Sequence, residues 1–553
     1  MKNIKYILLS AVSLTFFACN DIEDVDRVEA ELMVDAPALV AGSADFSKFV
    51  AVGNSLTAGF TDNALFIASQ ENSLPNMLSQ KFALIGGGDF TQPLMNDNVG
   101  GIAIAGNRIL QPRLVFDIST STPVSLDDLS STPVTVSTDL AFNNPTGPFN
   151  NMGVPGAKSF HLLAPGYGNI ANLAPQLANP YFVRMTGTTP NASVLDLTLA
   201  QQPSFFSLWI GNNDVLGYAL SGGDGSSALT PVEGAAGVGF SATYATLIGA
   251  LTANGAKGVV ANIPNVTSIP HFTTVPFSPL SPANPLFGPQ IPTLNGVFGQ
   301  LNQVFAFLES QGVTGATSRQ IVFSETAASA VVVKDESLTD LSAQITAVLS
   351  ASDTFPVFVQ SFGLPAQAAP LVASLFGNIY GQARQATAAD LLVLPSSAII
   401  GKVNASSVLF LQGQGLSEAL ATQFSLEGIT LPLADKWVLL PSEQEEIATA
   451  VSAFNSIIAE NASQAGLALV DVNSILSELA SSGISTGDFI LTSKLATGGA
   501  FSLDGVHPTA RGYSFLANEF MKAIDVTYGS NFEASGSLLN PADYPTNYAA
   551  GLQ

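Results

Sequence analysis

Short apolar runs alternate with helix-like segments along this chain. The runs that predict buried strands are 49–52, 204–210, 258–262 and 467–472. The segments that predict helices are 75–82, 244–254, 338–349, 441–465 and one that follows Pro508. Strands alternating with helices favour a parallel sheet covered on both faces. Because ligand sites in such sheets lie beyond the carboxyl ends of the strands, the turns after these runs are where we expect chemistry.

The helix predicted from Pro441 carries a start signal. Ser442 stands at a capping position, and Glu445 follows three residues later. This spacing is typical of a capping box, in which the two side chains satisfy the free N–H groups of the first turn.

Two stretches interrupt the alternating pattern and are predicted to be insertions. Residues 86–148 are rich in Gly, Pro, Ser and Thr, with short β-like pieces such as 133–136. Residues 271–437 begin with several prolines and continue with helical segments, and we expect them to form a cap or lid. The phenylalanines of this second insertion either form a hydrophobic cap that favours fatty-acyl esters or fill the insertion's own core. They are Phe277, Phe287, Phe298, Phe305, Phe307 and Phe376.

The N-terminus predicts an exported, lipid-anchored protein. Lys2 and Lys5 precede an apolar segment, 7–18, that is too short to span a membrane, and Cys19 follows it. This segment resembles a bacterial lipoprotein signal, in which cleavage leaves the cysteine as a lipidated first residue. The acidic residues at 20–24 resemble the tether that sends some Bacteroidetes lipoproteins to the cell surface. An ordinary cleaved signal peptide is the alternative.

Composition narrows the class of protein. A chain of 553 residues that is 47% hydrophobic and 11% charged has enough apolar sequence for a large core, which excludes global disorder. The formal net charge is −24, and so acidic a surface argues against a nucleic-acid partner. A single cysteine excludes an intrachain disulfide and a cysteine-based zinc site. No later segment offers 18 unbroken apolar residues, so we expect no membrane-spanning helix after the leader.

Ser55 follows the first predicted strand at a tight glycine turn, Gly53-Asn54-Ser55. A nucleophilic hydroxyl needs exposure at a strand end, a base within hydrogen-bond reach and donors for an oxyanion. Taken alone, the segment is explained as simply by an ordinary glycine-serine turn, in which Ser55 is only a turn residue. It also departs from the hydrolase elbow G-x-S-x-G, because Thr57 stands where the second glycine would be.

The candidate base is found by elimination among three histidines. His161 and His271 are predicted to be structural or surface residues. His507 lies three residues after Asp504, in the segment DGVHP. This spacing lets a carboxylate fix one imidazole nitrogen and leaves the other free to act as a base.

Two further segments offer hydrogen-bond donors. Asn213 ends a strand-like run in GNND, where an uncharged side-chain donor suits an oxyanion hole. A helix N-cap is the alternative role for Asn213. The loop 151–157, NMGVPGA, presents backbone N–H groups that are able to point at a ligand. An ordinary Pro-Gly turn is the alternative there.

Taken together, these segments resemble the SGNH, or GDSL-type, hydrolase superfamily. GNSLT at 53–57 resembles its first block, NMGVPG at 151–156 its second, GNND at 211–214 its third and DGVHP at 504–508 its fifth. The resemblance covers roughly 46–270 and 438–525. It implies a three-layer α/β/α fold with a central parallel sheet of flavodoxin-like type, carrying insertions at about 86–148 and 271–437.

The resemblance also implies roles for particular residues. Ser55 would be the nucleophile, His507 the base and Asp504 the residue that orients it. The oxyanion hole would consist of the backbone N–H groups of Ser55 and Gly156 and the side chain of Asn213, with Gly153 as the competing choice for Gly156. One departure stands out, since Asn54 replaces the aspartate usual in the family.

The sequence therefore predicts an ester hydrolase that forms an acyl-serine intermediate, with no metal or organic cofactor. The alternatives are a polysaccharide O-deacetylase and a non-catalytic surface binding protein on the same scaffold. The expected organisation is a signal peptide 1–19, a flexible tether 20–45, a hydrolase domain 46–525 and a tail 526–553. The expected partners are a small-molecule or glycan ester and, through the lipid on Cys19, the outer membrane of the cell envelope.

Overall fold

The computed structural model of the protein describes residues 36–130 and 132–552. The predicted signal peptide and the lipidation site at Cys19 lie outside the described residues. No helix in the described part of the chain is long and apolar enough to cross a membrane.

The centre of the fold is a parallel sheet of five strands. In chain order these are β1 (Phe49–Gly53), β6 (Asn151–Gly153), β7 (Phe205–Trp209), β8 (Lys257–Ala261) and β13 (Ala468–Val470). Their order across the sheet is β13-β8-β7-β1-β6, and every pair is parallel. Four of these strands were predicted from the sequence, whereas β6 occupies a segment expected to be a loop. The chain leaves β1 in one direction across the sheet and later returns to add β7 on its other side, which makes the β1/β7 boundary the switch point where ligands bind in such sheets.

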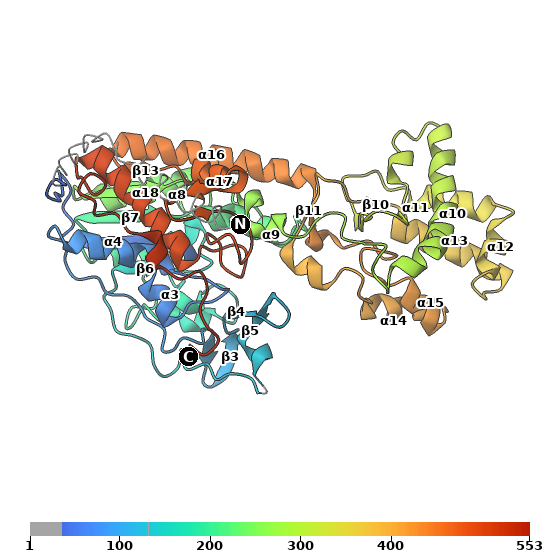
Figure 1. Ribbon diagram of the computed structural model, residues 1–553, viewed down its shortest axis with the longest axis horizontal. Helices are drawn as coiled ribbons and strands as arrows, with labels where there is room; N and C mark the ends of the chain where they lie inside the picture. The colour runs from blue at the N-terminus through green and yellow to red at the C-terminus, as the bar shows by residue number, and fades with distance from the viewer. Residues whose placement is uncertain (1–35, 131, 553) are drawn as a thin grey trace, which may run out of the picture.

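Helices cover both faces of the sheet (Figure 1). One face packs against α4 (Leu74–Ala83) and α18 (Ala510–Tyr528). The other face packs against α8 (Phe240–Thr252) and α16 (Pro441–Ala465). Every residue of the five strands is buried except Lys257 at the start of β8 and Leu469 in β13, which is why four of the strands lie in apolar runs of the sequence. The predicted α/β fold with a parallel sheet covered on both faces is confirmed.

The start of α16 differs from the predicted capping box. Its N-cap is Leu440, and the Glu443 carboxylate accepts a hydrogen bond from the Leu440 N–H at 2.6 Å. Pro441 occupies the first helical position, where a missing N–H costs nothing. The glutamate that satisfies the helix start is therefore Glu443, and not Glu445 acting with Ser442.

The first insertion carries two β-hairpins below the sheet (Figure 1). They pair β2 (Ile102–Ile104) with β3 (Asn107–Leu110), and β4 (Leu114–Asp117) with β5 (Thr122–Ser125). The β-like piece 133–136 forms no strand, so that detail of the prediction is wrong. Apolar β-branched residues in this piece pack as irregular chain against the hairpins instead.

Both ends of the described chain pack against this core. Ser43 donates its N–H to the Tyr528 carbonyl at 2.8 Å, so the part of the predicted tether from residue 36 to residue 45 lies against the end of α18. After α18 the tail returns to the first insertion. There the buried Arg113 guanidinium donates hydrogen bonds to the carbonyls of Tyr548, Ala549 and Leu552.

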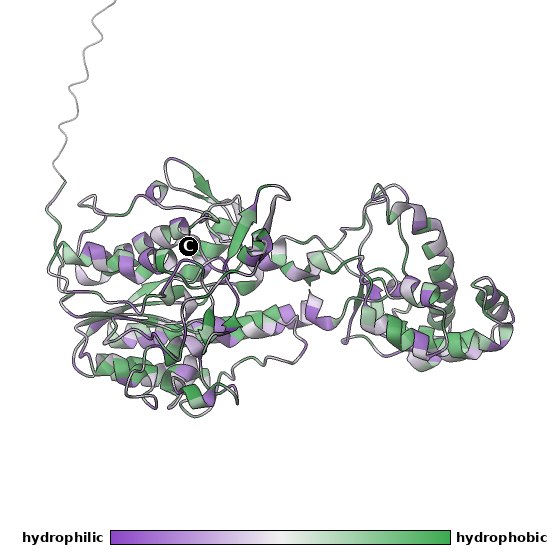
Figure 2. Cartoon of the chain, turned by 90° about the horizontal axis from the view of Figure 1, so that it is seen from below, coloured by the Kyte–Doolittle hydropathy of each residue, from purple (hydrophilic) through white to green (hydrophobic). Residues whose placement is uncertain are grey.

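The second insertion forms a separate lobe joined to the sheet domain by a narrow neck (Figures 1 and 2). Its helices are α10 (Ile291–Ser310), α11 (Ser342–Ala351), α12 (Phe355–Gln360), α13 (Ala369–Tyr380), α14 (Ala405–Gly413) and α15 (Glu418–Gln423). Its strands are β9 (Val332–Lys334) and β10 (Ala383–Gln385), and at the neck β11 (Leu391–Leu392) pairs with β12 (Val438–Leu439). The lobe has its own hydrophobic core.

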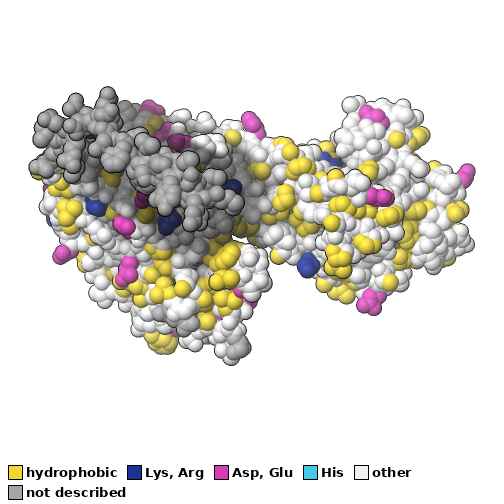
Figure 3. Space-filling view, viewed as in Figure 1, with side chains coloured by type: hydrophobic (Ala, Val, Ile, Leu, Met, Phe, Trp, Pro, Cys, Tyr) yellow, Lys and Arg dark blue, Asp and Glu magenta, His cyan; other side chains and the backbone are white. Residues whose placement is uncertain are grey.

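The phenylalanines of this insertion show what the lobe is built around. Five of the six named above belong to the lobe's core or pack against it, and Phe307 is the exception, with about half of its surface exposed. The interpretation in which they fill the insertion's own core is confirmed for those five. Figure 3 shows other hydrophobic side chains scattered over the lobe surface and few charged ones.

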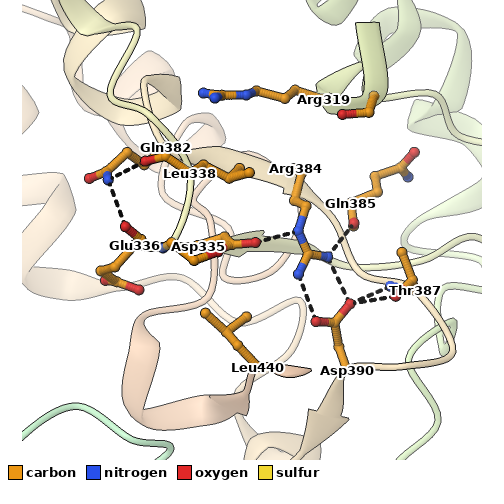
Figure 4. A network of polar contacts seen from close by, with 12 residues as sticks. Arg319, Asp335, Glu336, Leu338, Gln382, Arg384, Gln385, Thr387, Asp390 and Leu440 are labelled. Atoms are coloured by element: carbon orange, nitrogen blue, oxygen red, sulfur yellow. Dashed lines mark hydrogen bonds and ion pairs between the residues drawn. The ribbon is translucent and has the colours of Figure 1, made fainter. Parts of the chain in front are cut away.

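A buried ion network holds the base of the lobe together (Figure 4). Arg384 of β10 binds Asp390 through two hydrogen bonds of 2.7 Å and reaches Asp335 with its Nε at 2.6 Å. The Asp390 side chain is fully buried, and Thr387 donates to it as well. Each carboxylate is thus both paired and hydrogen-bonded, which is the condition for burying charge at low cost.

The remaining α-helices are short connections. In the sheet domain they are α2 (Ser55–Ala58), α3 (Ile67–Glu71), α5 (Pro180–Val183), α6 (Val194–Leu199), α7 (Asn212–Leu220) and α17 (Val472–Ser481), and at the neck α9 (Pro270–Thr273). Three of these helices follow strands of the central sheet: α2 follows β1, α7 follows β7 and α17 follows β13. They therefore lie at the carboxyl edge of the sheet.

Candidate active site

Ser55 lies where β1 ends and α2 begins, at the switch point of the sheet. The turn requires glycine at position 53, because a Cβ there would lie 2.2 Å from the Thr57 hydroxyl and 2.4 Å from the Trp209 carbonyl. The Asn54 side chain caps α2 by accepting a hydrogen bond from the Leu56 N–H at 3.0 Å. The strand stops here because the chain turns sharply against β7 and so presents Ser55 at the sheet edge.

Ser55, His507 and Asp504 form a connected set of hydrogen bonds. His507 Nε2 lies 2.9 Å from Ser55 Oγ, and His507 Nδ1 lies 2.8 Å from Asp504 Oδ2. The two partners of His507 thus sit on opposite nitrogens of one ring. With Nδ1 protonated and bound to the carboxylate, Nε2 has a lone pair directed at the serine hydroxyl. The three residues that the sequence predicted to act together are brought together.

The loop 501–508 holds His507 in this position. Ser502 donates its N–H to the His507 carbonyl at 2.8 Å, which closes the loop on itself. Asp504 Oδ1 accepts the N–H groups of Val506 and His507 at 2.8 and 2.9 Å. Burial opposes the negative charge of Asp504, but the charge of His507 and the hydrogen bonds from His507 and Val506 outweigh it. They hold the pKa of this carboxyl well below its usual value of 3.8.

Asn213 lies beside Ser55 at the start of α7. The preceding Gly211 takes a positive φ of 115°, which lets the chain turn from β7 into the helix. The Asn213 side-chain amide donates one hydrogen bond, to the Ala157 carbonyl at 2.9 Å. Because an amide nitrogen carries two hydrogens, one donor remains for a ligand. Asn213 and Ser55 line the same pocket.

The loop after β6 offers two glycines, and their N–H groups differ. The Gly153 N–H is bonded to the Asn151 side chain at 3.0 Å. Among residues 36–130 and 132–552, the Gly156 N–H has no hydrogen-bond acceptor, and Gly156 is exposed. A bound N–H is not free to receive an oxyanion. The observation favours Gly156, the choice made from the sequence, over Gly153.

Two buried pairs fix the elements that carry these donors. Asp214 accepts the N–H and the hydroxyl of Ser159 at 2.8 and 2.6 Å, which ties α7 to the loop containing Gly156. Asn54 donates its side-chain amide to Asn212 at 3.2 Å, which ties the Ser55 turn to α7. An aspartate at position 54 would have no hydrogen to donate in that pair. Asn54, the departure noted in the sequence, therefore has a partner suited to it.

A turn that was not predicted from the sequence supports Asp504 and its loop. Asp62 and Asn63 both take positive φ values, 51° and 61°, which non-glycine residues rarely adopt. The Asn63 N–H donates to Asp504 at 2.9 Å, and the Asp62 carboxylate accepts from the Leu503 N–H at 3.1 Å. The Asp62 N–H donates to the Ser502 hydroxyl at 3.0 Å. The turn itself is local, because hydrogen bonds of 3.1 and 3.0 Å between Thr61 and Ala64 close it, and Asp and Asn are the non-glycine residues that most often take positive φ. No sequence signal marks its contacts with the loop 501–508, which cross more than 400 residues.

No known family, curated protein or solved structure matches this chain. The chemistry of the site is therefore argued from its own residues. Within the described residues there is no group of three or more His, Cys, Asp or Glu side chains able to hold a metal ion.

The other two histidines have structural surroundings. His161 stacks on Tyr167 with ring centres 4.5 Å apart, and its Nδ1 accepts from the Lys158 N–H. His271 is buried at the neck, where its backbone N–H donates a hydrogen bond to the Gly505 carbonyl at 3.0 Å. Burial lowers the pKa of both imidazoles to about 4, with the charge of Lys158 adding to the effect at His161. In the described structure neither ring bonds a serine hydroxyl.

The pocket above Ser55 is walled by the sheet domain alone. Its space of about 810 Å³, which includes the part open to solvent, is bounded by residues before 270 and after 471. No residue of 271–437 lines it, and the lobe projects away from the sheet edge (Figure 1). The expectation that this insertion caps the site is therefore wrong. The apolar residues of the lobe form its own core, and its contact with the loop 501–508 is at the neck.

The buried carboxyl of Asp62 is expected to make the free energy of unfolding depend on pH. Burial raises the pKa of this carboxyl from 3.8 to about 7, with the charge of Asp504 adding to the shift and the Leu503 N–H and Arg113 opposing it. Between pH 3.8 and about pH 7, this carboxyl keeps its proton in the folded state and has lost it in the unfolded state. The free energy of unfolding therefore falls as pH rises through this range. We expect Asp62→Asn to increase the free energy of unfolding at pH 8 by up to about 4 kcal/mol.

The difference in the free energy of unfolding between Asp62→Asn and the wild type should shrink steadily as pH is lowered toward 4.5, because the wild-type carboxyl is then neutral in the folded protein. Urea denaturation of both proteins at several pH values measures it. A difference that is the same at every pH would show that Asp62 does not titrate in this range.

Proposed function

We propose that this protein is a serine ester hydrolase of the SGNH, or GDSL-type, superfamily that acts through an acyl-serine intermediate. The observation that carries the proposal is the chain of hydrogen bonds from Ser55 through His507 to Asp504. A nucleophile, a base and an orienting carboxylate in this order are what acyl transfer requires. The five-stranded parallel sheet, with Ser55 and Asn213 on either side of its switch point, supports the assignment to this superfamily.

In the first half-reaction Ser55 Oγ attacks the ester carbonyl carbon while its proton passes to His507 Nε2. The carbonyl oxygen becomes an oxyanion, which the N–H groups of Ser55 and Gly156 and the free N–H of Asn213 would stabilise. The carbon–oxygen bond to the alcohol then breaks. The leaving oxygen takes the proton from His507, and the acyl group stays bonded to Ser55.

In the second half-reaction His507 Nε2 takes a proton from water, which attacks the acyl carbon. The bond to Ser55 Oγ breaks, the proton returns to Ser55 and the acid is released. Asp504 stays ionised throughout and stabilises the imidazolium that forms twice in each cycle. These steps use only groups of this chain and water.

The proposed location is the cell envelope, with the protein held at the outer membrane by a lipid on Cys19. The support is the sequence alone: a basic start, a short apolar segment and one cysteine at its end. The acidic residues that follow favour export to the outer surface.

Hydrolysis of p-nitrophenyl acetate, butyrate and octanoate by residues 20–553, expressed without the leader, tests the proposal. We expect turnover of at least one ester, with kcat in the usual range of about 1–10³ s⁻¹. A folded protein that binds an ester without hydrolysing any of the three would instead support a binding protein on this scaffold.

A further inference from the structure

The pocket beside Ser55 is polar at one end only. Its polar side chains are those of Ser55, Asn212, Asn213 and His507, together at the catalytic end. Among the residues that line the rest are Leu216, Val266, Ile269, Leu491, Ala500 and Phe501. An apolar recess that starts at the reacting atoms offers nothing to a sugar hydroxyl or a charged group, but it favours a hydrocarbon.

One wall of the recess is a single face of α17. Val472, Ile475, Leu476 and Leu479 recur at helical spacing and all line the pocket, whereas Ser477 and Glu478 between them are exposed. Phe515 and Leu516 of α18 also line the recess. Leu476 keeps only 4% of its surface exposed, so this is a recess in the core of the sheet domain and not a surface patch.

We propose that this recess binds the acyl chain of the ester, so that the substrates are esters of medium- or long-chain fatty acids. The inference rests on the proposed function, since it concerns the same serine. The acyl group stays bonded to Ser55 while the alcohol leaves and water enters, and an apolar recess that begins at Ser55 suits the group that stays. The walls that set chain length are then α17 and α18, and not the lobe.

Chain-length selectivity tests the inference. Because burying one methylene is worth about a fourfold change in binding, we expect kcat/KM for p-nitrophenyl octanoate to exceed that for the acetate by at least about 100-fold. Leu476→Trp, which fills the recess, should lower this ratio at least about tenfold and change acetate hydrolysis less than about threefold. Ser477→Trp, on the exposed face of the same helix, is the matched control and should leave both rates unchanged.

Three results in these assays would overturn the assignment. The first is an octanoate-to-acetate ratio near one, and the second is a ratio that Leu476→Trp leaves unchanged. The third is a rate that rises with the alcohol chain, from ethyl acetate to octyl acetate, but not with the acyl chain. If Leu476→Trp fails to fold, Leu479→Phe one turn further along α17 makes the same test.

Binding separates this inference from the proposed function. Calorimetric titration of Ser55→Ala with dodecanoate needs no turnover, and we expect saturable binding that Leu476→Trp in the same background weakens at least about tenfold. If the wild type hydrolyses no ester but this binding is found, the recess is assigned correctly and the proposed reaction is wrong. If esters are hydrolysed and dodecanoate does not bind, the reaction stands and the acyl assignment is wrong.

Discussion

Replacing Ser55 by alanine is expected to lower kcat for ester hydrolysis by a factor of about 10⁴–10⁶, and His507→Ala by a similar factor. Without Oγ there is no atom to carry the acyl group, and without the imidazole there is no acceptor for the serine proton. Since the two residues act as one unit, the double variant should be no slower than either single one. Steady-state kinetics on p-nitrophenyl butyrate measure all three.

The chain offers a matched control for the histidine. Like His507, His161 is half-buried, and it stacks on an aromatic ring, but it contacts no serine hydroxyl in the described structure. His161→Gln is expected to keep kcat within about threefold of the wild type, as for a substitution outside the catalytic unit. Full activity in Ser55→Ala, or a loss in His161→Gln as large as that in His507→Ala, would contradict the assigned roles.

Asp504→Asn is the second substitution for which we expect a large fall in kcat. We expect kcat to fall by about 10⁴, because the amide turns a hydrogen-bond donor toward His507 Nδ1 and so stabilises the wrong tautomer. The oxygen of Asp504 that binds His507 also accepts the Asn63 N–H, so an amide nitrogen there would face the Asn63 donor. The variant should therefore be less stable as well as slow.

A control separates these two effects. Asn63 reaches Asp504 only through its backbone N–H, so Asn63→Gly keeps that contact and suits the positive φ of 61°. It should keep wild-type kcat. Thermal unfolding followed by circular dichroism then shows whether Asp504→Asn is folded at the assay temperature. A folded Asp504→Asn with near wild-type kcat would remove Asp504 from the catalytic unit.

Much of the sheet domain was predictable because its signals are local. Four strands lie in apolar runs and are buried apart from Lys257 of β8 and Leu469 of β13, and the helices around them follow at the expected places. The carboxyl ends of parallel strands share one edge, so Ser55 and Asn213 were expected to be neighbours. His507 was identified because the chain has three histidines and only one has a carboxylate three residues before it.

The parts that the sequence did not reveal depend on long-range contacts. The turn at Asp62 and Asn63 is closed locally by hydrogen bonds between Thr61 and Ala64, but its contacts with the loop 501–508 lie more than 400 residues away. The pairing between Asn54 and Asn212 is long-range as well. The apolar content of 271–437 was visible, but composition does not say whether a segment packs on itself or over a neighbour, and it packs on itself.

Covalent labelling tests the central claim most directly. A fluorophosphonate reacts much faster with an activated serine than with an ordinary hydroxyl, and Oγ displaces fluoride from phosphorus. Intact mass and peptide mapping of the protein after treatment should show one adduct, on Ser55, that is absent from Ser55→Ala and from His507→Ala. An adduct on another serine, or ester hydrolysis that continues at full rate in protein shown to be labelled at Ser55, would contradict the acyl-serine mechanism.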